Sequence, residues 1–250
     1  IFGKWHLGDD YPMRPMDQGF DESLVLKGGG IGSVPDLPNS YFDSRLYRDG
    51  KPVKGEGYCT EVFTDATIRF IESNRGRPFF AYLPFNAPHA PLVVDPKYSK
   101  PFSAMGLDEN AAKLYGMVAN LDENVGRLLK RLRELDLEQN TIVIFTVDNG
   151  AWSGVKRFNA GMAGWKGSVQ DGGVRQSFFF RWPGKVQGGR KVDRIAAHID
   201  MLPTLLEATG AKKPERVKFD GVSLMPLLRG QNVNWPERNL FVQFNRGLVP

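Results

Sequence analysis

The chain of 250 residues holds one cysteine, Cys59, and has no long hydrophobic run. A single cysteine excludes a framework of internal disulfides and a zinc site built from several cysteines, but it does not tell a cytosolic chain from an exported one. The longest uninterrupted apolar stretches, residues 79–83 and 142–145, are far shorter than the roughly 20 residues that cross a bilayer. The sequence therefore predicts no transmembrane segment.

The chain also lacks a concentration of charge of one sign. Its 33 basic and 28 acidic residues give a net charge of +5, and the basic residues are spread along the sequence. A nucleic-acid-binding protein is expected to show a dense basic stripe or a recognisable reading motif, and this sequence contains neither. The composition therefore predicts no nucleic-acid partner and suits an anionic ligand only weakly.

Hydrophobic residues make up 41% of the chain, enough for a sizeable core. Short β-type runs alternate with amphipathic helical runs, which is typical of the α/β class with a mainly parallel sheet flanked by helices. The strand patterns predict a buried strand at 78–83, a central strand covered on both faces at 141–147, and an aromatic strand at 176–182.

The helical patterns predict a helix capped by Thr60, a long helix opened by Asp108, and a helix over 199–209. Between the first strands, residues 28–57 are rich in glycine, proline, asparagine and aspartate and are expected to be mostly loop, with a tight hairpin turn over residues 48–51. The residues after Gly210 are expected to start a smaller unit.

Lys4 and His6 flank Trp5 at the start of the chain. In a strand, a two-residue spacing sends two side chains to the same face, so these residues would make that face polar and cationic. The alternative is a solvated lysine and an incidental histidine at a strand end.

His89 follows the predicted strand at 78–83, so it is expected on the loop leaving the carboxyl end of that strand, where ligand sites in open α/β sheets gather. Pro88 and Pro91 bracket it and restrict the loop, which would hold the imidazole in one orientation, as a general acid requires. A surface histidine on a rigid turn is the competing interpretation.

Asp148 and Asn149 end the most strand-like run of the chain and offer hard oxygen ligands, suited to calcium or magnesium. An ordinary turn is the alternative, and two residues alone cannot satisfy calcium. Lys166 lies in a glycine-rich loop where a fixed ammonium would bind an oxyanion, unless the loop is a flexible, solvated one. Arg175 is a weaker candidate of the same kind.

Three other conspicuous residues have structural interpretations. Asp200 is expected to cap the helix at 199–209, with His198 supporting it, because Pro203 falls in the first turn. Cys59 has no neighbouring cation pattern that would lower its pKa, so it is expected to be an inert buried thiol.

Five short motifs, in one order across residues 1–210, together resemble the formylglycine-dependent sulfatases, arylsulfatase-like members of the alkaline phosphatase superfamily. The motifs are GKWHLG at 3–8, NAPHAP at 86–91, VDNG at 147–150, GWKG at 164–167 and HIDMLPT at 198–204. The resemblance implies a sulfatase catalytic domain over 1–210, with 211–250 starting a C-terminal subdomain. It also implies hydrolysis of a sulfate ester by a hydrated formylglycine beside a divalent cation, usually calcium.

The resemblance also implies roles for individual residues. Lys4 would contact the nucleophile and the sulfate, His6 would help to release sulfate from the covalent intermediate, and His89 would face the leaving oxygen. Lys166 would clamp the sulfate. Asp148 and Asn149 would supply part of the cation site.

The nucleophile motif of that family, Cys/Ser-x-Pro-x-Arg, is missing. Cys59 is followed by Thr60-Glu61-Val62-Phe63, and the nearest other match, at 33–37, has leucine where arginine is required. Asp9 and Asp10 follow a glycine in a loop, so they are not the family's first cation-binding pair, which follows a hydrophobic strand. The missing parts precede Lys4 in the family's order, and the chain opens at Ile1 without a leader, so an incomplete sulfatase, truncated at its N-terminus and inactive by itself, is expected.

Two other functions stay open. A phosphate or phosphonate ester hydrolase would keep the architecture, because both anions are tetrahedral, and a non-catalytic relative would keep only an anion pocket. The expected substrate is a small-molecule or glycan sulfate ester, and the loops at 28–57 and 156–163 carry no pattern that identifies it. The resemblance suggests a periplasmic or secreted protein, and the oligomeric state is not predicted. Without its first strand, the chain is expected to be poorly stable or to aggregate.

Overall fold

The chain folds into two compact units, Ile1–Leu137 and Glu138–Pro250. The computed structural model describes residues 1–152, 158–235 and 237–244. Within these ranges no helix combines the length and the apolarity needed to cross a membrane.

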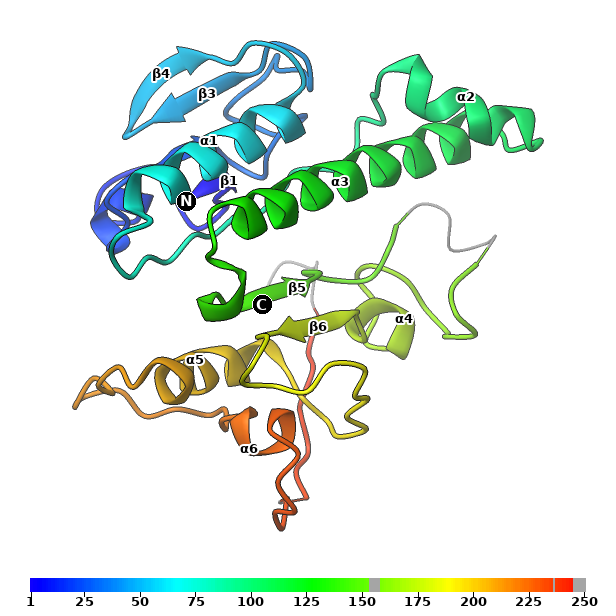
Figure 1. The fold of residues 1–250 in the computed structure, drawn as a ribbon. Helices are drawn as coiled ribbons and strands as arrows, with labels where there is room; N and C mark the ends of the chain where they lie inside the picture. The colour runs from blue at the N-terminus through cyan, green and yellow to red at the C-terminus, as the bar shows by residue number, and fades with distance from the viewer. Residues whose placement is uncertain (153–157, 236, 245–250) are drawn as a thin grey trace, which may run out of the picture. The chain divides into compact units, whose positions relative to one another are not determined.

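The first unit contains a four-stranded sheet in the order β1-β2-β3-β4 (Figure 1). Its strands are β1 (Phe2–Lys4), β2 (Leu24–Leu26), β3 (Arg45–Arg48) and β4 (Lys51–Lys54). β1 and β2 are parallel, whereas β2 pairs with β3 and β3 with β4 in antiparallel fashion. The prediction of a mainly parallel sheet is therefore wrong for the described strands. A two-residue connection such as that between β3 and β4 permits only antiparallel pairing.

The turn between β3 and β4 confirms the predicted hairpin. Asp49 and Gly50 both have positive φ angles, 48° and 81°. Positive φ at both central residues defines the turn whose twist matches that of antiparallel strands, and Asp-Gly is a preferred sequence for it.

The first unit also contains a 3-10 helix (Pro15–Gln18) and three α-helices: α1 (Cys59–Asn74), α2 (Pro96–Ala104) and α3 (Glu109–Glu134). α1 and α3 were both predicted. Asp108 caps α3, because its side chain accepts a hydrogen bond from the N–H of Ala111 at 3.0 Å. Thr60 does not cap α1: the helix begins one residue earlier, after Tyr58, and no side chain caps it. Thr60 lies buried within the first turn instead.

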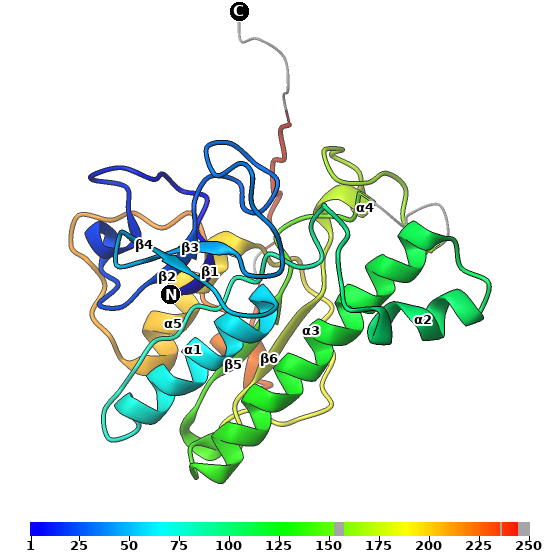
Figure 2. The same cartoon turned by 90° about the horizontal axis from the view of Figure 1, so that it is seen from above.

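The core of the first unit lies on both faces of the sheet. Phe2, Leu24 and Leu26 pack with Phe63 of α1 in the main cluster, while Val25, one residue out of phase, packs on the other face with Ile1 and Trp5. This alternation follows from the two-residue period of a strand. Burying each large apolar side chain of this core contributes about 1.5–3 kcal/mol to stability. α1 and α3 lie side by side (Figures 1 and 2).

Residues 78–83 are extended but do not form the predicted buried strand. The N–H groups of Phe2 and Lys4 donate to the carbonyls of Tyr82 and Pro84, at 3.0 and 2.7 Å, so the segment lies beside β1. Phe80 and Tyr82 are nevertheless 62% and 45% exposed. Proline has no N–H to add to a strand ladder, and this limits the pairing of the segment.

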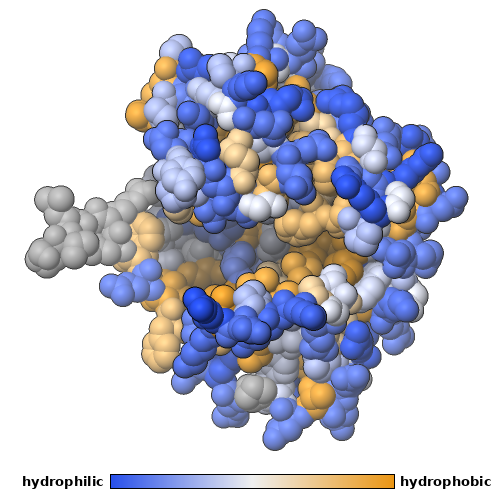
Figure 3. All heavy atoms as spheres, turned by 90° about the vertical axis from the view of Figure 1, so that its left-hand side faces the viewer, coloured by the Kyte–Doolittle hydropathy of each residue, from blue (hydrophilic) through white to orange (hydrophobic). Residues whose placement is uncertain are grey.

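The second unit contains a two-stranded antiparallel sheet of β5 (Val143–Thr146) and β6 (Phe178–Arg181). β6 falls within the predicted aromatic strand. The prediction of a central strand covered on both faces at 141–147 is wrong, because β5 pairs with β6 alone among the described strands, and Phe145 and Phe179 are exposed. On the face shown in Figure 3, hydrophobic residues lie in patches among hydrophilic ones.

The second unit also contains short helices joined by long irregular segments. α4 (Asp171–Val174) precedes β6, and a 3-10 turn (His198–Asp200) leads into α5 (Met201–Thr209), which confirms the predicted helix. α6 (Met225–Leu228) follows, and the N–H of Leu224 donates to the buried Thr204 hydroxyl of α5 at 2.9 Å. The predicted boundary after residue 210 separates a catalytic domain from a C-terminal subdomain, which is a different division from that between the two compact units. It stays a prediction.

Candidate functional site

Lys4 and His6 do not share a strand face. β1 ends at Lys4, and His6 lies beyond it with a φ of 57°, so the prediction of two side chains on one strand face is wrong. Both side chains nevertheless lie against the same glycine turn. A Cβ placed on Gly29 would be 3.3 Å from His6 Nε2, and one placed on Gly30 would be 3.5 Å from Lys4 Cδ.

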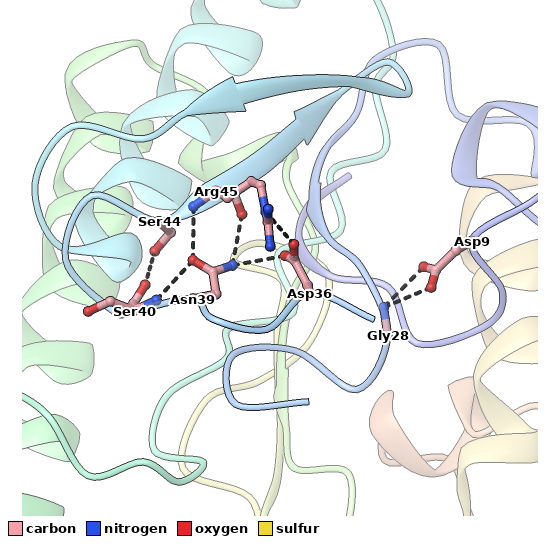
Figure 4. A network of polar contacts seen from close by, with 7 residues as sticks. All are labelled: Asp9, Gly28, Asp36, Asn39, Ser40, Ser44 and Arg45. Carbon is pink, nitrogen blue, oxygen red and sulfur yellow. Dashed lines mark hydrogen bonds and ion pairs between the residues drawn. The ribbon is translucent and has the colours of Figure 1, made fainter. Parts of the chain in front are cut away.

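Polar contacts of Asp9 and Asp36 hold the glycine turn and the loop after it (Figure 4). The N–H of Gly28 donates to both carboxylate oxygens of Asp9, at 3.1 and 3.0 Å. Asp36, 2% exposed, accepts from Arg45 Nε at 2.6 Å and from Asn39 Nδ2 at 2.9 Å. Asp9 therefore binds the main chain of the glycine turn. The loop over residues 28–57, which was expected to face a substrate, is held by the buried carboxylate of Asp36. The second such loop, 156–163, begins with two residues outside the described ranges.

His89 lies on the loop that follows the extended segment, as predicted. Its main-chain N–H donates to the carbonyl of Asn86 at 2.9 Å, and its ring nitrogen Nδ1 lies 2.7 Å from the carbonyl oxygen of Ala90. A carbonyl only accepts hydrogen bonds, so Nδ1 carries a proton and the chemistry of the ring falls to Nε2.

Two residues that the sequence analysis missed hold this loop. Tyr41, fully buried, donates from its hydroxyl to the carbonyl of His89 at 2.5 Å, and Asn86 Nδ2 donates to that hydroxyl at 2.6 Å. Asn86 belongs to the motif that identified His89, so its position was available in the sequence. Nothing local marks Tyr41, because its partners are 45 and 48 residues away.

Asp148, Asn149 and Lys166 lie on neighbouring loops of the second unit. The N–H of Lys166 donates to the carbonyl of Ala151 at 3.0 Å, and that of Gly150 donates to Gly173 at 2.9 Å. Asp148 is exposed, and its Oδ1 accepts from the N–H of Asn149 at 2.9 Å. Lys166 is half-buried. The main chain of Lys166 is thus hydrogen-bonded to the loop that carries the two oxygen donors.

The metal-binding capacity of these residues is partial. A carboxylate and an amide oxygen are hard donors that suit calcium, but calcium takes six to eight oxygens. In the described part of the chain, no group of three or more histidine, cysteine, aspartate and glutamate residues is placed to hold a metal ion. Asp148 and Asn149 therefore fit as part of a cation site, not as a whole one.

The structure confirms that Cys59 is buried, but the prediction that Asp200 caps the helix is wrong. Arg175 is exposed, and His198 Nε2 lies 3.1 Å from the carbonyl of Val147. Asp200 stands before α5 but does not cap it: its carboxylate pairs with Arg238 at 2.5 Å and accepts main-chain N–H groups instead. Cys59 is 1% exposed, and burial raises the pKa of its thiol.

The family model for sulfatases matches residues 1–211, and the chain belongs to the sulfatase family. It is 31% identical to human N-acetylgalactosamine-6-sulfatase over 254 residues, covering 94% of this chain and 47% of that protein. It is 31% identical to the uncharacterized sulfatase YdeN of Escherichia coli (strain K12) over 233 residues, covering 91% of this chain and 40% of YdeN. The chain thus spans about half the length of the curated relatives it matches.

A solved structure has the same fold. The crystal structure of Ps i-CgsB in complex with k-i-k-neocarrahexaose is similar with a TM-score of 0.83 and 29% sequence identity, covering 92% of this chain and 55% of that one. The fold is therefore the alkaline-phosphatase-like sulfatase fold, although the sheets of this chain are small and mixed.

Proposed function

We propose that the chain forms part of an enzyme that hydrolyses a sulfate monoester to an alcohol or phenol and sulfate. The observation that carries this proposal is the placement of Lys4 and His6 against one glycine turn, which Asn86 ties to the His89 loop, in a chain of the sulfatase family. Two nitrogen-bearing side chains at one turn, with a third on the loop linked to it, suit a sulfate group with a departing oxygen.

Each residue has a distinct role in this proposal. Lys4 binds the sulfate oxygens and the nucleophile, while His6 assists the release of sulfate from the covalent intermediate. His89, in its doubly protonated form with Nδ1–H held by the Ala90 carbonyl, donates the Nε2 proton to the leaving oxygen or contacts the sulfate. Lys166 clamps the sulfate. Fixed cations of this kind stabilise the charge that builds on these oxygens, and they gain strength where water is excluded.

Asp148 and Asn149 would hold a divalent cation, for which calcium is the proposed identity, together with donors outside this chain. Such a cation, when bound, neutralises charge on the sulfate. The nucleophile is proposed to be a formylglycine outside these residues, because the environment of Cys59 does not fit one: the thiol is buried and its pKa is raised by burial.

The substrate class proposed is a glycan sulfate. One relative is named for a 6-sulfated amino sugar, and the solved structure holds a neocarrahexaose, so the homologous sites accept saccharides. An aryl sulfate would serve as a general reporter substrate.

The test compares turnover of 4-nitrophenyl sulfate and 4-nitrophenyl phosphate by the enzyme that contains this chain, before and after removal of divalent cations with a chelator. A sulfatase hydrolyses the sulfate in preference and loses activity on chelation. Preference for the phosphate would favour a phosphate or phosphonate ester hydrolase, and turnover of neither ester would favour a non-catalytic anion binder.

Residues 1–250 by themselves are predicted not to turn over sulfate esters, since no residue among them fits the nucleophile. Metal-dependent hydrolysis above background by a preparation of these residues alone would contradict this.

A further inference from the structure

The Tyr41 hydroxyl stands at the centre of a small buried hydrogen-bond network. It donates to the carbonyl of His89 at 2.5 Å and accepts from Asn86 Nδ2 at 2.6 Å, with the Asn86 carbonyl further away at 3.3 Å. Tyr41 is fully buried and Asn86 is 3% exposed. Buried hydrogen bonds of this kind fix one geometry, because breaking them would leave polar atoms unsatisfied away from water.

Asn86 connects this network to the glycine turn. Its Oδ1 accepts from the N–H of Ile31 at 3.3 Å and occupies the space where a Cβ of Gly30 would stand. Lys4 Cδ lies 3.5 Å from the same position. The network thus reaches the His89 loop at one end and, at the other, the turn against which Lys4 and His6 lie.

The two carbonyls that set the position of the His89 ring belong to adjacent residues. Tyr41 holds the carbonyl of His89, and the next carbonyl, of Ala90, accepts from Nδ1 at 2.7 Å. A displacement of the main chain at His89 would therefore move the acceptor that fixes the tautomer. Burial raises the pKa of Tyr41, so its hydroxyl remains a donor throughout the working pH range.

We propose that Tyr41 and Asn86 are positioning residues that hold the His89 imidazole in a fixed place and tautomer relative to Lys4 and His6. Their contribution to catalysis rests on the proposed function, whereas the fixing of the ring does not. A proton donor must be held to within about 0.5 Å of its productive position, so loss of the Tyr41 hydroxyl is expected to weaken proton donation and leave sulfate binding largely intact.

Tyr58 provides the matched control. Its ring stacks on that of Tyr41 at 5.4 Å between centroids, it is 7% exposed, and its hydroxyl donates to a carbonyl at 2.8 Å. That carbonyl belongs to Val93, four residues beyond His89, and not to His89 or Ala90, whose carbonyls set the position of the ring. Tyr41→Phe and Tyr58→Phe therefore each delete one buried hydroxyl from the same aromatic stack, and their effects on stability should be similar.

The kinetic experiment measures kcat for sulfate esters with good and poor leaving groups in the enzyme that contains this chain. Tyr41→Phe is expected to lower kcat about tenfold to a hundredfold for an alkyl sulfate and less than about threefold for 4-nitrophenyl sulfate, whose leaving group needs no proton. Tyr58→Phe should change kcat for the two esters by the same factor. In a His89→Ala background, Tyr41→Phe should add no further loss. Equal losses on both esters, or an additive loss in that background, would overturn the proposal.

A second measurement is independent of turnover. With isotope-labelled histidine, the His89 ring signals are assigned by their loss in His89→Gln, and the nitrogen shifts report the tautomer. The spectra are recorded at a pH where the ring is neutral, the form left after Nε2 has given up its proton. The expected result is a single Nδ1–H tautomer that becomes mixed in Tyr41→Phe and is unchanged in Tyr58→Phe; identical spectra in all three proteins would overturn the proposal. If the intact protein hydrolyses no sulfate ester, the proposed function fails and this measurement alone decides the positioning role. If Tyr41→Phe does not fold, Asn86→Ser replaces it in both experiments. This substitution removes the amide group that donates to the Tyr41 hydroxyl and keeps the Tyr41 side chain.

Discussion

Lys166 shows how a single side chain can be tested without disturbing the fold around it. Its main chain is held by the hydrogen bond to Ala151, and that bond does not involve the side chain. In the enzyme that contains this chain, Lys166→Ala is expected to lower kcat for 4-nitrophenyl sulfate about a hundredfold to a thousandfold, the usual effect of removing one oxyanion donor.

The control for Lys166 is Lys185→Ala, which removes an exposed lysine from the turn after β6 and should leave kcat unchanged. A loss of less than threefold in Lys166→Ala would remove this residue from the mechanism.

Asp200 links stability to pH. Burial alone raises the pKa of Asp200, but hydrogen bonds from Arg238 and from the N–H groups of Val222 and Ala197 outweigh it, so the pKa lies below its usual value. A lowered folded-state pKa means that ionised Asp200 stabilises the fold above about pH 4, and this contribution is lost as the pH falls through the folded-state pKa.

Asp200→Asn is therefore expected to lower the free energy of unfolding by about 3 kcal/mol at pH 7, because it leaves Arg238 without its buried partner. Denaturant melts at a series of pH values should show the two proteins converging in acid. Asp193→Asn, at an exposed carboxylate paired with Lys191, should change stability by less than about 0.5 kcal/mol. A constant difference between wild type and Asp200→Asn down to pH 2 would contradict the linkage.

At the scale of single residues, the sequence could single out residues that stand in short motifs. His89, Lys4 and Lys166 were chosen in this way, and their roles stay predictions. Tyr41 could not be singled out, because its role comes from contacts with a loop 48 residues away. The positive φ of His6 could not be predicted from the sequence either. β1 ends at Lys4, so Lys4 and His6 do not lie on one face of a strand.

At the scale of elements, two glycines of α3 have opposite surroundings. A Cβ on Gly116 would lie 3.0 Å from Ser99 N and 3.1 Å from the carbonyl carbon of Tyr98, which are main-chain atoms of α2. A Cβ on Gly126 would meet no atom within 4 Å. Gly116 is thus required for the close packing of α2 on α3, whereas Gly126 only weakens the helix.

Gly126→Ala is expected to stabilise the protein by about 0.5–1 kcal/mol, because alanine restricts the unfolded chain and favours the helix. Gly116→Ala is expected to destabilise it by about 1–3 kcal/mol through overpacking. Chemical denaturation of the two variants and the wild type measures both effects, and the same sign for the two substitutions would contradict the packing described for α2 and α3.

Elements set by local sequence were predicted well, and those set by distant partners were not. α1 and α5 follow from helical periodicity, α3 from periodicity and the Asp108 cap, and the β3–β4 hairpin from a two-residue turn. The predicted burial of residues 78–83 and 141–147 was wrong, because the hydrophobicity of a strand does not determine which elements cover it. The direction of pairing was wrong for the same reason, since alternating strands and helices do not fix which strands become neighbours.

At the scale of the whole molecule, the second unit has the weakest framework. Its sheet has two described strands, and a two-stranded sheet is marginally stable without further cover. Phe145 and Phe179 are 38% and 64% exposed on these strands. Residues 1–250 prepared alone are therefore expected to melt without strong cooperativity or to aggregate, as judged by size-exclusion chromatography and calorimetry. A monomer with one sharp transition would contradict this.

The main proposal is that Lys4, His6, His89, Asp148, Asn149 and Lys166 act on one sulfate, as the resemblance to the sulfatases implies. The most direct measurement is a crystal structure, with sulfate bound, of the enzyme that contains this chain. The account predicts that the nitrogen-bearing side chains lie within hydrogen-bond or ion-pair distance of the anion, and that the two oxygen donors lie beside a cation next to it. A structure that places these six side chains on separate faces of the molecule would contradict the account.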